Sequence, residues 1–333
     1  MLKRSISTLL TAAAFLAGTA LLAPEASAVT VTSTKKVTLK LAHPNPETHI
    51  FHKAALEFKK EVEAKSNGNI TVNIFPANQL GGSKEIVQSV SLGAVELNIS
   101  GSAQFSAFNS DLEALDLPFL FATREDAYRK LDGEAGAYLA KPLEKKNIKV
   151  LGYLDGGFRS MFNSQRPLVH PQDFKGLPVR VQDSSVYMDM MSSMGALPTF
   201  LPWGDLYVSI QQGIVQAGEA GVAQIYAQRF YEVAKYVSLT NHTFTTNPFV
   251  MANNKWKALP GDYQELLMEA TRNMVAFERA GIVKDEEEAM KKLKEAGAQI
   301  NEVDPAEFQA AVAPVWKRYA EKNGQKLIDL LTR

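Results

Sequence analysis

Alternating and helical hydrophobic patterns divide the first hundred residues into strands and helices. Residues 37–42 and 70–75 alternate between apolar and polar side chains, which predicts two strands. Apolar residues recur at helical spacing over 50–64, and residues 84–92 also predict a helix. Residues 95–100 are typical of a short buried strand. Strands that alternate with helices in this way predict a mostly parallel sheet with helices on both faces, and so an α/β fold.

The rest of the chain predicts a second α/β unit and one long helix. Strands are expected near 149–154 and 178–181, and the pattern over 260–296 is almost continuously helical. A helix of that length is expected to cross between two domains. Residues 299–303 predict a strand, and Asp-Pro-Ala-Glu at 304–307 predicts the start of a final helix.

The N-terminus has the three parts of an export signal. Lys3 and Arg4 are positively charged, residues 9–22 form an apolar run, and Ala-Ser-Ala at 26–28 is a signal-peptidase pattern that predicts cleavage after Ala28. The apolar run is short for a membrane span, which needs about 20 apolar residues. We therefore expect a signal peptide over 1–28 and a soluble mature protein outside the cytoplasm.

Composition narrows the compartment and the partners. The chain has no cysteine, which excludes disulfides, thiolate metal sites and lipid attachment through cysteine. An exported protein without an anchor is expected in the periplasm of a Gram-negative cell. Acidic and basic residues balance at 36 each, so nucleic acid and anionic membranes are poor partner candidates. About 300 mature residues predict two domains.

Enzyme motifs are missing from the sequence. It contains no G-x-S-x-G elbow, Walker loop, dinucleotide-binding G-x-G-x-x-G or H-E-x-x-H helix, so we predict no enzyme and no cofactor. His43, His49 and His52 are close enough in sequence to suggest a metal site. No second cluster of ligands at suitable spacing accompanies them, so no metal is predicted.

Ligands of open α/β sheets gather at the carboxyl ends of strands. The loop that follows Leu41 contains His43 and Thr48, and Ser100 follows Ile99. We therefore predict that His43, Thr48 and Ser100 contribute to a ligand site.

Three sequence blocks carry a resemblance to a known family. They are FPANQLGG at 75–82, the stretch from GGFRSMFNS to VQAGEAG at 156–221, and FYEVAKYVSLTNH at 230–242. Together they resemble the solute-binding proteins of tripartite ATP-independent periplasmic (TRAP) transporters, of the C4-dicarboxylate-binding type. The resemblance covers essentially all of the mature chain.

The resemblance implies a fold and its boundaries. Family members consist of two α/β domains that are joined by strands and a long hinge helix and close on the ligand like a flytrap. On this chain, domain I is expected over 36–156 and 246–285, and domain II over 157–245 and 286–333.

The resemblance also implies site residues. Arg180 matches the family arginine that clamps the substrate carboxylate, and a guanidinium suits this task because its rigid fork of donors meets both carboxylate oxygens. Arg159 matches a second basic position, which either contacts the ligand or pairs with an acidic residue. Trp203 is expected to line the cleft, with a core tryptophan as the alternative. His242, at the end of the third block, is a further candidate.

The sequence departs from the family pattern after the glutamine-rich helix. Many members have an asparagine that binds the substrate where this chain has Ala220. Either the ligand lacks the group normally bound there or another side chain reaches in. Glu219 is expected to orient an arginine, or else to accept a hydroxyl or ammonium group of the ligand. Asp183, three residues after Arg180, is a candidate for the same contact. These differences make dicarboxylates less attractive as ligands.

The sequence therefore predicts a monomeric periplasmic receptor that captures a small organic acid, a monocarboxylate or sugar acid, and delivers it to TRAP membrane subunits. One alternative is a receptor for an amine-containing or atypical solute, with Glu219 and Asp183 as counter-charges. Another is a sensor that presents the bound acid to a membrane kinase. An exported hydrolase is a third, with Ser160 or Ser184 as nucleophile, although no histidine lies close in sequence as a base. The identity of the ligand is not predicted.

Overall fold

The computed structural model describes residues 29–333, so the predicted signal peptide lies outside the described residues. The strands that it contains pair into one nine-stranded mixed sheet with the order β2-β1-β3-β8-β4-β7-β5-β6, and β9 pairs with β8. The strands are β1 (Val37–Ala42), β2 (Ile70–Phe75), β3 (Leu97–Ile99), β4 (Ile148–Asn163), β5 (Pro178–Val181), β6 (Leu197–Phe200), β7 (Ala217–Gly221), β8 (Tyr236–Ala252) and β9 (Gln299–Glu302).

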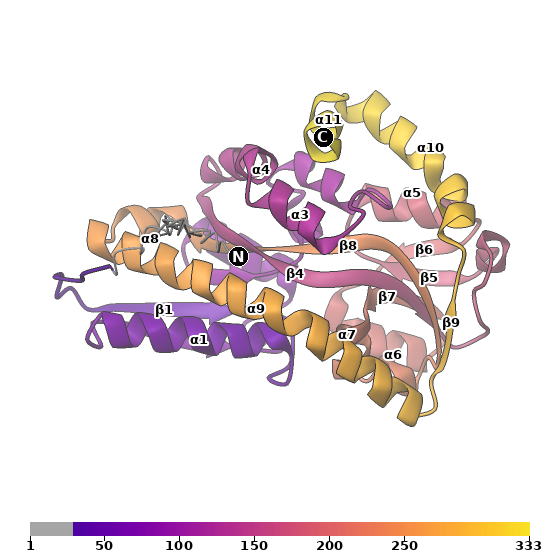
Figure 1. The fold of residues 1–333 in the computed structure, drawn as a ribbon, viewed down its shortest axis with the longest axis horizontal. Helices are drawn as coiled ribbons and strands as arrows, with labels where there is room; N and C mark the ends of the chain where they lie inside the picture. Colours follow the sequence, from indigo (N-terminus) through magenta and orange to yellow (C-terminus); the bar gives the residue numbers. More distant parts are fainter. Residues whose placement is uncertain (1–28) are drawn as a thin grey trace, which may run out of the picture.

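Helices cover both faces of the sheet (Figure 1). The α-helices are α1 (Ile50–Lys65), α2 (Ser83–Leu92), α3 (Arg124–Leu131), α4 (Glu134–Glu144), α5 (Ser185–Ser193), α6 (Leu206–Gln211), α7 (Val222–Ala227), α8 (Asn253–Lys257), α9 (Gly261–Glu295), α10 (Pro305–Asn323) and α11 (Lys326–Thr332). The 3-10 helices are η1 (Ser102–Phe105), η2 (Ser110–Asp116), η3 (Pro171–Phe174), η4 (Trp203–Asp205) and η5 (Phe230–Glu232).

Two lobes share this sheet. The first lobe is defined here as residues 37–99 (β1–β3 with α1 and α2), and the second lobe as residues 178–227 (β5–β7 with α5–α7). Strand pairs inside each lobe are parallel, as the sequence predicted. The long strands β4 and β8 join the lobes through antiparallel pairs, which the hydrophobic pattern did not predict.

The two hydrophobic cores follow the faces of the sheet and run through both lobes. One core lies beneath α1, α6, α7 and α9, and it contains Leu39 of the first lobe and Leu206 of the second. The other lies beneath α2–α5, α10 and α11, and it contains Ile86 and Val179. Each core therefore ties the lobes together.

Local sequence explains why the main elements begin and end where they do. In α1 the buried face includes Ala54 and Phe58, and His49 caps its N-terminus by accepting from the Phe51 amide. Asp304 caps α10 by accepting from the amide of Ala306, which confirms the predicted helix start.

The long helix α9 runs diagonally across the molecule and packs on both α1 and α7 (Figure 1). It has 35 residues and is therefore about 52 Å long. Gly281, near its middle, is needed for close packing, because a Cβ there would lie 2.6 Å from Cδ1 of Ile50 in α1. The predicted crossing helix is thus present.

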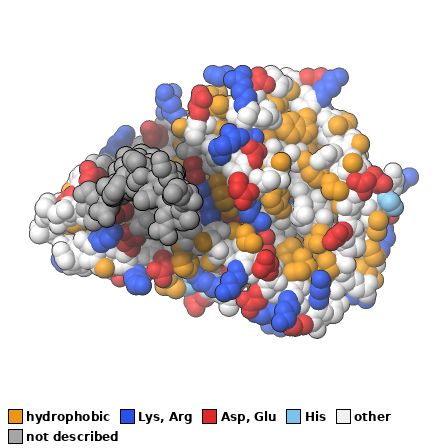
Figure 2. Space-filling view, viewed as in Figure 1, with side chains coloured by type: hydrophobic (Ala, Val, Ile, Leu, Met, Phe, Trp, Pro, Cys, Tyr) orange, Lys and Arg blue, Asp and Glu red, His pale blue; other side chains and the backbone are white. Residues whose placement is uncertain are grey.

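Charges of both signs are scattered over the face in Figure 2, between apolar patches. No helix in residues 29–333 combines the length and the apolar character that crossing a membrane requires.

Candidate functional site

A small inner cavity of about 40 Å³ lies between the two lobes, at the carboxyl ends of β1, β3, β5 and β7. This is where strand ends of an open α/β sheet usually receive a ligand. The cavity is lined by residues from both lobes, from the loop after β3, and from the joining strands β4 and β8. The lining residues are Pro44, Asn45, Ser83, Gly101, Gln104, Arg159, Arg180, Gln182, Trp203, Gln224, Thr245 and Asn247.

Arg180 presents a free end of its guanidinium at this cavity. The side chain is 2% exposed, and its Nε donates to the carbonyl of Leu201 at 2.9 Å. Its Nη1 is buried and has no hydrogen-bond partner among residues 29–333. Burial lowers the pKa of Arg180 to about 10, although the charge of Glu219 opposes this, and Arg159 lowers the pKa further; Arg180 therefore stays positive at neutral pH. A buried cation with an unused donor is suited to bind an anion.

Trp203 forms the wall between the inner cavity and a wider outer chamber. The guanidinium carbon of Arg180 lies 5.4 Å from the centre of the Trp203 ring. The outer chamber, of about 410 Å³, shares Ser83, Gln104, Arg180 and Trp203 with the inner cavity. Trp203 also packs edge to face on Phe230. The tryptophan therefore lines the cleft and packs against η5, just outside the second lobe, at the same time.

Arg159 is held from behind by Glu219. Its Nε donates to a carboxylate oxygen of Glu219 and its Nη2 donates to the Glu219 carbonyl, while Nη1 donates to the hydroxyl of Thr245 at 3.1 Å. Both ends of the ion pair are at most 3% exposed. Nε2 of His242 lies 3.7 Å from the same carboxylate. Glu219 thus orients Arg159, which was the favoured sequence interpretation.

Electrostatics keep this pair ionised. Burial raises the pKa of Glu219, but Arg159 and His242 lower it more, so the carboxyl remains below its usual range. Burial likewise lowers the pKa of Arg159, and Glu219 more than offsets that effect. Burial lowers the pKa of His242, so its ring is neutral at pH 7. These bonds engage three of the five N–H donors of Arg159, so two donors remain for a ligand, while the charge is balanced by Glu219.

The sequence reasoning missed the carboxamides that line the inner cavity: Asn45, Gln104, Gln182, Gln224 and Asn247. The position of Gln182 two residues after Arg180 could have revealed it, because alternate residues of an extended segment share a face. Gln224 lies four residues after Ala220 and supplies a carboxamide to the cleft, although Ala220 itself cannot.

The structure corrects the prediction for Asp183. Its carboxylate does not line the cavity but forms a 2.5 Å ion pair with Lys84 of α2, with both side chains solvent-exposed. Alternation explains this, since Asp183 points away from the face that Arg180 and Gln182 share. The pair links the first lobe to the second at the mouth of the cleft.

Three further predicted residues also lie away from the inner cavity. His43 and Ser100 border a tightly filled space behind Pro44, and Nε2 of His43 lies 3.2 Å from Nδ1 of His52. Burial, with the charge of His52, lowers the pKa of His43 to about 3. Thr48 lines a separate pocket of about 490 Å³ between α1, α7 and α9.

The alternative chemistries gain no support from the geometry. Within the described part of the chain, no three histidine, aspartate or glutamate side chains are placed to share a metal ion. The Ser160 hydroxyl bonds to Asn241, and the Ser184 hydroxyl is buried without a hydrogen-bond partner in residues 29–333. In residues 29–333 neither serine hydroxyl is hydrogen-bonded to a histidine, the usual activating base.

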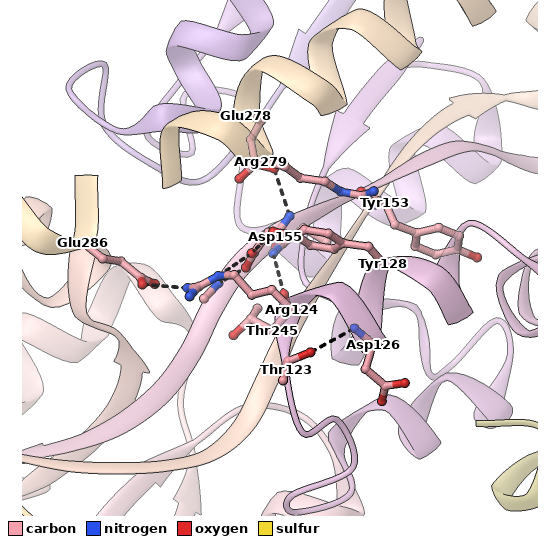
Figure 3. Close-up of polar contacts among 12 residues, drawn as sticks. Thr123, Arg124, Asp126, Tyr128, Tyr153, Asp155, Thr245, Glu278, Arg279 and Glu286 are labelled. Atoms are coloured by element: carbon pink, nitrogen blue, oxygen red, sulfur yellow. Dashed lines mark hydrogen bonds and ion pairs between the residues drawn. The ribbon is translucent and has the colours of Figure 1, made fainter. Parts of the chain in front are cut away.

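Behind the cleft, a second cluster of charges joins β4 to α9 (Figure 3). Arg124 lies between two carboxylates, donating to Asp155 of β4 at 2.8 Å and to Glu286 of α9 at 2.6 Å. The Glu278 carboxylate accepts from the Asp155 amide at 3.1 Å. Strand β4 shifts register between Asp155 and Phe158, so the cluster lies where the strand is irregular.

Gly157 makes the approach of the helix possible. It has a φ of +81°, its amide donates to Asp155 at 2.6 Å, and a Cβ on it would collide with the carboxylate of Glu286. Arg159 follows two residues later in β4. The charge cluster and the ligand cavity are therefore linked through one short stretch of strand.

We expect Glu286 to make the stability of the protein depend on pH. Burial raises the pKa of Glu286 from 4.5 to about 7, although Arg124 opposes this. Between these values the folded protein binds a proton that the unfolded chain has lost. The stabilisation that Glu286 gives by holding this proton is therefore full below pH 4.5 and disappears as the pH rises through 7. The free energy of unfolding of the wild type should fall by about 3 kcal/mol over this range relative to Glu286→Gln. Urea denaturation at a series of pH values measures it, and parallel curves for the two proteins would contradict the prediction.

Comparison with known proteins matches the chain to one family over most of its length. The model for the bacterial extracellular solute-binding proteins, family 7, matches residues 41–323. The chain is 28% identical over 322 residues to the 2,3-diketo-L-gulonate-binding periplasmic protein YiaO of Escherichia coli (strain K12), covering 96% of each chain. It is 31% identical over 282 residues to the C4-dicarboxylate-binding periplasmic protein DctP of Rhodobacter capsulatus, covering 83% of this chain and 84% of that protein.

A solved structure has the same fold. The crystal structure of a TRAP periplasmic solute binding protein from Sulfitobacter sp. NAS-14.1, with bound beta-D-galacturonate, superposes with a TM-score of 0.86 at 30% identity. The match covers 89% of this chain and 99% of that chain. The predicted flytrap architecture of two α/β domains is thereby confirmed.

Proposed function

The chain belongs to family 7 of the bacterial extracellular solute-binding proteins, and from this premise we propose that it captures a small acid with one carboxylate and several hydroxyl groups. The observation that carries the proposal is the unpartnered Nη1 of Arg180 in a cavity lined by carboxamides. The guanidinium binds the carboxylate, and the amides donate to and accept from hydroxyl groups.

The distribution of charge favours one carboxylate over two. The charge of Arg159 is neutralised by Glu219, and three of its five N–H donors are given to that residue and Thr245. Lys84, at the mouth, is paired with Asp183. A second carboxylate of the ligand would therefore leave water without a free cation to receive it, which is costly. A sugar acid such as galacturonate or galactonate fits better than a C4-dicarboxylate.

An amine-containing ligand is disfavoured by the positions of the acids. Glu219 lies behind Arg159 and is fully buried. Asp183 is exposed and does not line the inner cavity. An ammonium group in the cavity would instead meet the positive charge of Arg180.

The wider role follows from the family. We propose that the mature protein works in the periplasm as a monomer, catalyses nothing itself, and delivers its ligand to TRAP membrane subunits. We also propose the boundaries stated above, with domain I over 36–156 and 246–285 and domain II over 157–245 and 286–333. Ligand that bridges the two domains would shift the population toward the closed form.

Isothermal titration calorimetry with a matched set of solutes tests the ligand class. We expect galactonate or galacturonate to bind with a Kd around micromolar, which corresponds to roughly 8 kcal/mol. Galactitol, which keeps the hydroxyl groups but lacks the carboxylate, should bind roughly 100-fold more weakly or not at all. Succinate should also bind more weakly than the sugar acids. Equal affinity for galactitol and galactonate would overturn the proposal.

A further inference from the structure

Asn45 stands out in the wall that faces Arg180 because its whole amide is unused. The side chain is 1% exposed and lines the inner cavity together with Arg180 and Gln224. Neither its Nδ2 nor its Oδ1 has a hydrogen-bond partner in the described part of the chain. Buried amide groups are nearly always paired, so a partner for this one has to come from within the cavity.

The backbone around Asn45 is rigid. The residue lies between Pro44 and Pro46, whose rings fix their φ angles and restrict the residue before each of them. Its carbonyl accepts from the amide of Ala77 at 3.0 Å, which ties the loop after β1 to the end of β2. The Cα and Cβ of Asn45 are therefore held at a fixed place, and the buried side chain begins from that point at the cavity wall.

The chemistry of the amide indicates what it binds. One edge of a carboxamide offers a donor and an acceptor side by side. A hydroxyl group can act as either, so two neighbouring hydroxyl groups match this edge, whereas a methylene chain leaves both amide atoms unpaired. A site built to bond a hydroxyl discriminates strongly against an analogue that lacks it.

Three other unpartnered polar atoms close to Asn45 in the fold belong to residues that do not line the cavity. Nδ1 of His43, Oγ of Ser100 and Oδ1 of Asn98 are also buried without partners in residues 29–333. All three residues border the filled space behind Pro44. Of this group, Asn45 alone lines the inner cavity.

We propose that Asn45 determines specificity from the first lobe by binding two neighbouring hydroxyl groups of the acid whose carboxylate Arg180 holds from the second. This inference rests on the proposed function and deepens it, since it names the part of the ligand that each lobe recognises. An acid without the hydroxyl pair would engage only one lobe, and closure would bury the Asn45 amide unpaired.

Calorimetry with Asn45→Ala and deoxy acids tests the inference. The probe is whichever of galactonate and galacturonate binds the wild type more tightly, together with its monodeoxy analogues. In the wild type, two analogues that lack neighbouring hydroxyl groups should bind roughly 10- to 100-fold more weakly than the parent acid. The affinity of Asn45→Ala for the parent acid should be lower than that of the wild type by a similar factor. The variant should then bind those two analogues as tightly as it binds the parent acid.

Controls separate this inference from the proposed function and from misfolding. Asn73→Ala removes an exposed amide from β2 of the same lobe and should leave every affinity unchanged. Asn45→Ala should keep the thermal midpoint of the ligand-free protein, because the amide it removes makes no hydrogen bond there. If Asn45→Ala lost the same affinity for the parent acid and for all analogues, or lost none, the role of Asn45 would be overturned. The proposed function would still stand. If neither acid binds the wild type, the proposed function and this inference both fail.

Discussion

Arg180→Ala is expected to weaken the binding of galactonate or galacturonate by roughly 100-fold or more. The ligand carboxylate would lose its charged partner while still being buried between the lobes. Truncation of one partner of a buried charge pair typically costs 2 to 5 kcal/mol, and about 1.4 kcal/mol corresponds to a tenfold change in Kd. Isothermal titration calorimetry measures the loss directly.

A second variant distinguishes charge from geometry. Arg180→Lys keeps the positive charge but lacks the planar fork of donors, so its affinity should lie between those of the wild type and the alanine variant. The alanine variant loses the hydrogen bond from Nε to the Leu201 carbonyl, which contributes about 1.5 to 3 kcal/mol, but it also removes a buried charge, so it should stay folded. Binding of wild-type strength by Arg180→Ala would remove Arg180 as the carboxylate clamp.

Glu219→Ala is expected to lower the free energy of unfolding by about 3 to 5 kcal/mol, the usual cost of removing one partner of a buried ion pair. Arg159, 3% exposed at its side chain, would keep its charge and lose both a counter-charge and an acceptor. Because Arg159 also lines the cavity, ligand affinity should fall as well. Urea denaturation gives the stability, and calorimetry gives the affinity.

The chain offers a matched control at the mouth of the cleft. Asp183→Asn breaks the ion pair with Lys84, but both side chains are exposed to water, so the free energy of unfolding should change by less than about 1 kcal/mol. If the Glu219 and Asp183 variants lost similar stability, the buried pair would not have the importance assigned to it here.

The elements that the sequence predicted well have one buried face and clear ends. In α1, Ala54, Phe58 and Val62 recur at helical spacing, and β1 alternates because it has a buried and a more exposed face. The strands β4 and β8 have 16 and 17 residues and are buried along most of their length. Burial on both faces removes the alternation, and Gly156 and Gly157 interrupt β4, so its full length could not be predicted.

The candidate site was predicted only as far as family motifs and charge extend. The strand motif around Arg180 led to a residue that lines the inner cavity, and Trp203 lines it too. The role of Arg180 as a carboxylate clamp stays a prediction. Asn45 and Gln224 were missed because a carboxamide has the same sequence signal on a surface as in a cavity. Asp183 was misplaced because counting residues from Arg180 ignored the alternation of side chains in an extended segment.

Three continuous elements, β4, β8 and α9, pass between the lobes, and both hydrophobic cores extend with them. Separation of the lobes therefore has to bend a helix and a pair of strands, because these elements are continuous between the lobes. The two lobes therefore share the same bending elements, β4, β8 and α9. We expect the resistance of these elements to bending to limit how far the lobes separate and to return them to the same alignment after each release of ligand. Such a receptor can bind and release ligand repeatedly while its two lobes keep the same relative orientation.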